Sequence, residues 1–183
     1  MKAAEAEVEM DGVEGTAQDV DQYLTFIMAD EEYGVDILSV KEIRNWDSAT
    51  PIPKSPDHVR GVINLRGTIV PIIDLRQCFG MEAIEYGPLT VVLVLQVTSE
   101  RGKREVGIVV DAVSDVYSLG ESQVKPAPDM GATININFIK GLASIDEKMV
   151  ILLNIDRLLN QEDFTGVSDL HQAVTEAVQA AAE

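Results

Sequence analysis

Hydrophobic and polar residues alternate along much of the chain between residues 22 and 160, and a period of two is typical of β-strands. Leu24, Phe26 and Met28 open the pattern and share one face of an extended segment. A polar turn at residues 30–32 follows, and the extended pattern then resumes. This region is therefore predicted to be mainly β.

A hairpin, a helical turn and a buried strand are predicted next. Val62–Leu65 and Thr68–Leu75 flank Arg66-Gly67, where glycine adopts a positive φ without steric strain. Asp74–Phe79 has the length of one helical turn, which the following glycine would end. Val91–Val97 is apolar at nearly every position, which predicts a strand that is covered on both faces.

An internal repeat is the most informative feature of the pattern. Residues 61–75 align with residues 141–155 at an offset of 80, with apolar positions matched to apolar positions. Residues 33–40 align less tightly with residues 106–113 at an offset of 73, which places a longer loop at 126–137. Self-similarity on this scale indicates two copies of one supersecondary unit, and each copy is too small to bury much apolar surface alone.

The repeat predicts two packed β-barrels of about five strands each, with short helices and a C-terminal helix. The first barrel is expected over residues 22–88 and the second over 89–160, although strands can cross over between them. Residues 1–21 are predicted to be a disordered acidic leader. Residues 161–183 form an acidic tail, in which apolar residues at helical spacing after Ser168 predict either a weakly docked helix or a partner-binding helix.

Charge excludes several classes of partner. The formal net charge is −17, and it is concentrated at the ends of the chain: residues 1–21 hold seven acids against Lys2, and residues 161–183 hold five acids and no Lys or Arg. No cluster of basic residues matches a nucleic acid or an anionic membrane surface, and no apolar run has the length of a membrane span. The single cysteine excludes an internal disulfide and fits a reducing cytoplasm.

Candidate catalytic chemistry is sparse. His58 and His171 stand alone, without the spacing of metal ligands, and each is interpreted as a solvated side chain. Cys78 is interpreted as a small buried apolar residue. The chain contains no glycine-rich phosphate-binding motif, so neither an enzyme nor a cofactor is expected. A small-ligand-binding or unrecognised hydrolytic double barrel is the alternative.

Five segments, in order, resemble the CheW family of chemotaxis coupling proteins. They lie at residues 30–44, 60–76, 106–116, 125–128 and 149–155, and the second, Arg60-Gly-Val-Ile-Asn-Leu-Arg-Gly-Thr-Ile-Val-Pro-Ile-Ile-Asp-Leu-Arg76, is the most distinctive. The resemblance implies two five-stranded SH3-like barrels and a non-catalytic adaptor.

The resemblance also implies partners and a location. Proteins of this family join the cytoplasmic tip of methyl-accepting chemoreceptors to the regulatory domain of the histidine kinase CheA, and further copies can join them in rings. A cytoplasmic protein at receptor arrays of the inner membrane is therefore expected, without direct insertion into the membrane.

By position in the family motifs, the receptor-binding residues are expected to be Val40, Glu42, Gly61, Arg66 and Ile69. Arg66 at a hairpin tip can grip a carboxylate or a backbone carbonyl, whereas by composition alone it is a solvated turn residue. Three of these residues have a second interpretation. Val40 could be a core residue, and Glu42 could be an ordinary surface charge. Gly61 could be required by backbone geometry alone.

The kinase-binding and ring-forming surface is expected to include Lys125 and Met130. Related proteins often have Arg and an aromatic residue at these positions. Lys cannot make the bidentate contact of Arg, and Met is a softer apolar anchor, so these departures predict a weaker contact here.

Overall fold

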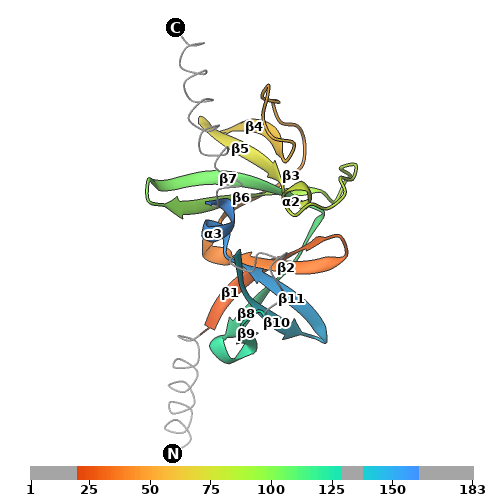
Figure 1. The fold of residues 1–183 in the computed structure, drawn as a ribbon, viewed down its shortest axis with the longest axis vertical. Helices are drawn as coiled ribbons and strands as arrows, with labels where there is room; N and C mark the ends of the chain where they lie inside the picture. Colours follow the sequence, from red (N-terminus) through yellow and green to blue (C-terminus); the bar gives the residue numbers. More distant parts are fainter. Residues whose placement is uncertain (1–19, 129–137, 161–183) are drawn as a thin grey trace, which may run out of the picture.

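The computed structural model describes residues 20–128 and 138–160, and most of these residues lie in two packed sheets (Figure 1). Sheet A contains β1 (Val20–Met28), β2 (Glu31–Asp36), β8 (Ala112–Gly120), β9 (Val124–Lys125), β10 (Ile139–Ile145) and β11 (Lys148–Leu153). Sheet B contains β3 (Val40–Asn45), β4 (Val59–Leu65), β5 (Thr68–Asp74), β6 (Val91–Ser99) and β7 (Gly102–Val110). The helical turns are η1 (Ile37–Ser39), α2 (Leu75–Cys78), η2 (Glu121–Gln123) and α3 (Ile155–Leu159). The predicted mainly β fold with short helices is confirmed.

Neither sheet is built from one half of the chain. Sheet A has the order β8-β1-β2-β11-β10-β9, so the first hairpin of the chain is inserted among strands of the second repeat. Sheet B has the order β3-β6-β7-β5-β4, so the first hairpin of the second repeat is inserted among strands of the first. The strands cross over between the expected halves, residues 22–88 and 89–160, because the two repeats exchange their N-terminal hairpins.

Two parallel strand pairings hold the exchanged hairpins in place. Ile72 on β5 lies opposite Gly107 on β7, and Leu152 on β11 lies opposite Gly34 on β2. A Cβ atom on Gly107 would lie 2.5 Å from Cδ1 of Ile72, and one on Gly34 would lie 2.8 Å from Cδ2 of Leu152. These pairs are equivalent in the internal repeat, so in both repeats a glycine leaves room for a large aliphatic side chain on the neighbouring strand.

The β4–β5 and β10–β11 hairpins also repeat each other in detail. Each contains a register shift next to an equivalent glycine, Gly61 or Gly141. Each is followed by a residue that caps a short helix: Asp74 accepts hydrogen bonds from the first turn of α2, and Asn154 does the same for α3. The predicted hairpin and helical turn are confirmed.

Strand β6 separates two hydrophobic cores. Val92 and Val94 lie in the core of sheet B, whereas Leu93 and Leu95 lie in the central cluster between the sheets. All four side chains are buried, which confirms the strand covered on both faces. Burial of each such side chain contributes about 1.5–3 kcal/mol.

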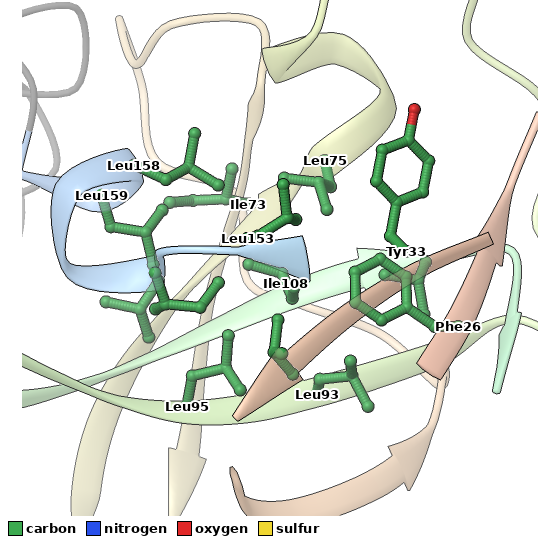
Figure 2. Packing of buried hydrophobic residues seen from close by; sticks show 14 of the residues in the cluster. Phe26, Tyr33, Ile73, Leu75, Leu93, Leu95, Ile108, Leu153, Leu158 and Leu159 are labelled. Atoms are coloured by element: carbon green, nitrogen blue, oxygen red, sulfur yellow. The ribbon is translucent and has the colours of Figure 1, made fainter. Parts of the chain in front are cut away.

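The central cluster draws on both sheets and on α3 (Figure 2). Phe26 and Tyr33 enter it from sheet A and stack with ring centroids 6.0 Å apart. Ile108 enters from sheet B, and Leu158 and Leu159 cover it from α3. Because apolar side chains of both repeats meet here, the two sheets pack as one hydrophobic unit.

The described part of the chain begins within the predicted acidic leader and ends just before the predicted acidic tail. β1 starts at Val20, before the expected boundary at Gln22, because Val20 pairs with Gly120 of β8. The rest of the predicted leader, Met130 and the predicted C-terminal helix lie outside the described residues. Within the described ranges, no helix is long and apolar enough to span a membrane.

The hairpin exchange predicts that the two halves cannot fold separately. When the chain is cut between the exposed Pro88 and Leu89, each fragment alone should lack a cooperative melting transition, because each lacks strands that its sheets need. Mixing the fragments should restore the strand signal in circular dichroism and the transition. A single fragment that melts cooperatively as a monomer would contradict the exchanged pairing.

Candidate interaction surface

All five residues predicted to bind a receptor lie on strands of sheet B or in a turn between two of them. Val40 and Glu42 lie on β3, Gly61 lies on β4, Arg66 lies in the β4–β5 turn, and Ile69 lies on β5. β3 and β4 are the two outer strands of this sheet. The structure brings Glu42 and Arg66 together, with Nη2 of Arg66 3.6 Å from Oε2 of Glu42.

Arg66 is presented by a rigid turn. Its own φ of 55° and that of Gly67, 88°, form a tight hairpin connection. The side-chain oxygen of Asn64 accepts a hydrogen bond of 2.8 Å from the N–H of Gly67 and fixes the turn further. The Arg66 side chain is 79% exposed, so its guanidinium extends into solvent from a fixed backbone.

Glu42 has spare hydrogen-bonding capacity. Its side chain is 26% exposed, and Oε2 is buried without a hydrogen bond to any described residue. The 3.6 Å separation from Arg66 is longer than a hydrogen bond, so this oxygen can still accept one. The pair therefore offers an outside group a charged donor, the Arg66 guanidinium, which the buried Glu42 oxygen faces from behind.

Gly61 is required by the backbone. Its φ is 137°, a conformation that side chains rarely adopt, and a Cβ atom would overlap the carbonyl oxygen of Thr50. That carbonyl accepts a hydrogen bond of 2.9 Å from the N–H of Val62, which closes the outer side of β4. Because Gly61 is also buried, it can affect a binding surface only by setting the path of the β4 backbone.

Val40 and Ile69 have partly apolar surroundings. Val40 is half-buried and packs against the central cluster. Ile69 is half-buried beside Val59 and Val62 on β4. Both side chains are therefore anchored by packing and remain partly accessible, Val40 on the outer strand β3 and Ile69 on the inner strand β5.

A hollow of about 300 Å³ opens between β3 and β4, and the sequence analysis did not predict it. Arg44 on β3 and Asn64 on β4 line it, together with Trp46. Trp46 meets Tyr86 edge-on with ring centroids 4.7 Å apart, and the Tyr86 hydroxyl donates a hydrogen bond of 2.5 Å to buried Asp74. Burial and this hydrogen bond raise the pKa of Tyr86, so the hydroxyl remains a neutral donor.

The residues predicted for the kinase and ring contact lie elsewhere. Lys125 is exposed on β9, an outer strand of sheet A, where it pairs with Leu142 of β10. Met130 lies outside the described residues. The structure therefore places Lys125 on a different sheet from the Glu42–Arg66 pair.

The described residues hold little reactive chemistry. No group of three or more His, Cys, Asp or Glu within them is arranged to hold a metal ion. Burial, assisted by the negative charge of Asp74, raises the pKa of the Cys78 thiol, and a protonated thiol is a poor nucleophile.

Comparisons with known proteins give one consistent family. Residues 22–163 match the family model of the CheW-like domain. The chain is 46% identical over 149 residues to the chemotaxis protein CheW of Klebsiella aerogenes, covering 81% of this chain and 87% of that protein. It is 38% identical to the chemotaxis protein CheW of Rhizobium meliloti over 142 residues, covering 78% of this chain and 89% of that one. The crystal structure of the scaffolding protein TtCheW from Thermoanaerobacter tengcongensis superposes with a TM-score of 0.69 at 32% identity, covering 78% of this chain and 94% of that chain.

The position of Gly61 predicts a difference between two glycine substitutions. Gly61→Ala should lower the free energy of unfolding by about 2 kcal/mol or more, because the new Cβ meets Thr50 and the backbone is strained. Gly67→Ala is the matched control, since Gly67 also has a positive φ but a Cβ there would meet no atom within 4 Å. Urea denaturation measures both. Equal stability of the two variants would contradict the backbone role of Gly61.

Proposed function

Because the chain belongs to the CheW-like domain family, whose members are coupling adaptors of chemotaxis, we propose that it joins the cytoplasmic tip of a chemoreceptor to the regulatory domain of the histidine kinase CheA. The observation that carries the proposal is the Glu42–Arg66 pair, which lies on two motifs of the family and presents an exposed guanidinium from a fixed turn. An adaptor needs such docking surfaces and no reaction centre.

The receptor contact is proposed to form at the outer strands of sheet B. The exposed Arg66 guanidinium is suited to a bidentate contact with a carboxylate, or to capping backbone carbonyls at the bend of a helical hairpin. Glu42 would hold the Arg66 guanidinium in position through the ion pair. Val40 and Ile69 supply apolar contacts at either side of the pair.

Two exposed apolar residues extend this surface beyond the family positions. Leu38 in η1 is 85% exposed, and Ile43 on β3 is 46% exposed. Ile43 shares the face of β3 that Val40 occupies, so a bound helix could contact Leu38, Val40 and Ile43 beside the charged pair.

The kinase contact is proposed to form on sheet A, where Lys125 lies on the outer strand β9. Separate sheets allow a receptor and a kinase domain to bind one chain together, and further copies of the chain could join through the same region. This arrangement implies a cytoplasmic location at receptor arrays of the inner membrane. No observation on the described residues favours the small-ligand or hydrolytic alternative.

The proposed receptor contact predicts a selective loss of binding in Arg66→Glu. Its affinity for a purified receptor tip should fall about tenfold or more, because the reversed charge repels the carboxylate partner, while the melting temperature changes little. The affinity of Arg66→Lys should fall less, since Lys keeps the positive charge although it lacks the planar guanidinium. Co-sedimentation with receptor-containing membranes measures all three proteins.

Lys148→Glu is the matched control, because it makes the same charge change on an exposed residue beside the equivalent turn of sheet A. Lys148→Glu should bind the receptor as the unmodified chain does. Undiminished binding by Arg66→Glu would show that the receptor face lies elsewhere.

A further inference from the structure

Strand β8 of sheet A repeats the surface features of strand β3 of sheet B. The two strands are equivalent in the internal repeat, and each shifts its register against its neighbour directly after equivalent valines, Val40 and Val113. Beyond the shift, Ile43 and Val116 each lie opposite a leucine of the central cluster. These two side chains are 46% and 45% exposed, so both sheets present an apolar group at the same position.

The β10–β11 hairpin adds a second apolar group to sheet A. Met149 corresponds in the repeat to Ile69, and it is 53% exposed. It shares a face of β11 with Ile151, which packs against the central cluster. Because β11 is paired with β2 on one side and with β10 on the other, a partner must contact side chains here and cannot add a strand to β11.

The charges at these equivalent positions differ between the sheets. The Glu42–Arg66 ion pair of sheet B corresponds to Asp115 and Asp146 in sheet A. The two turns share a backbone conformation, since Arg66 has a φ of 55° and Asp146 a φ of 50°. Both aspartates are exposed, and neither forms an ion pair with a described residue. Two free carboxylates therefore stand where the other sheet has a neutralised pair.

Tyr117 shows that the acidic groups lie close together. Partial burial and the charges of Glu32, Asp115 and Asp146 raise the pKa of this tyrosine. Its ring packs against the cluster inside sheet A, between β8 and the end of the β10–β11 hairpin. The carboxylates of β8 and of the hairpin turn thus act on one side chain, and they give this end of the sheet a negative potential.

Charge decides which partner fits this end of sheet A. The ends of the chain itself do not fit, because residues 1–21 hold seven acids against Lys2 and residues 161–183 hold five acids without Lys or Arg. A second copy, with its net charge of −17, is repelled as a whole. A segment of another protein that carries Lys or Arg is attracted, and its charges would meet both carboxylates.

We propose that Asp115, Val116, Asp146 and Met149 form an acidic face that binds an amphipathic helix of another protein, with Lys or Arg on both sides of its apolar stripe. The choice of a helix rests on the proposed receptor contact, because the acidic face repeats the positions of that surface. The preference for a basic partner rests on sheet A alone. The face would therefore recognise a different partner from the surface around Arg66, which favours a carboxylate.

Isothermal titration calorimetry of the full chain at physiological ionic strength tests the acidic face. The probe is a designed peptide with leucine at helical spacing and lysine at the other positions, and its control has glutamate in place of lysine. One lysine peptide should bind per chain, and the glutamate peptide should not bind. Val116→Thr should weaken binding about fivefold, whereas Ile43→Thr, the matched change on sheet B, should leave it unchanged.

The charge contribution has its own control. Asp146→Asn should weaken binding of the lysine peptide about threefold or more, and asparagine tolerates the positive φ of this turn. Glu100→Gln removes an exposed carboxylate from the β6–β7 turn and should not change the affinity. All four substitutions are at exposed residues, so the melting temperature should change little. Equal losses in Asp146→Asn and Glu100→Gln would show general charge attraction and overturn the proposal.

Binding of a purified receptor tip separates this proposal from the adaptor function. Val116→Thr should bind the receptor tip normally, whereas Ile43→Thr should bind it more weakly. Loss of receptor binding in Val116→Thr would assign the acidic face to the receptor, and unchanged peptide binding in Val116→Thr would place the peptide elsewhere, so either result overturns the proposal. If Ile43→Thr keeps its receptor affinity while Val116→Thr loses the peptide, only the receptor face is misplaced and the acidic face stands.

Discussion

The parallel pairing of each inserted hairpin with the other repeat is the interaction on which the rest of the structure depends. β7 lies beside β5, and β2 lies beside β11, in each case with a glycine opposite a large aliphatic side chain. Without these pairings, β6 would lose one of the two cores that bury it, and the central cluster would lose either Phe26 or Ile108. The two sheets therefore stabilise each other and form one cooperative unit.

This mutual support explains how so small a chain can carry the proposed docking surfaces. The sheets bury their apolar faces against each other, so turns and outer strands are free to carry contacts without weakening the core. Arg66 sits on a turn fixed by Asn64, and Lys125 lies on the far edge of the other sheet. A rigid frame with contacts on different sheets suits a protein that connects two partners.

Local features were predictable from the sequence, whereas the exchange was not. The hairpin around Arg66-Gly67 and the strand at Val91–Val97 depend on neighbouring residues, so turn chemistry and periodicity reveal them. The pairing of Gly34 with Leu152 joins residues far apart in the chain, and the same repeat could equally close each barrel on itself. Family motifs indicated Glu42 and Arg66 as candidates, whereas Tyr86 lies in an irregular loop without periodicity, so no pattern pointed to it.

Simultaneous binding of a receptor and the kinase, through different sheets, is the proposal on which the adaptor role depends. Light scattering coupled to size-exclusion chromatography, with purified receptor tip and CheA regulatory domain, can test it. The account predicts a ternary complex with the mass of all three components. Binding of one partner that displaces the other would contradict it.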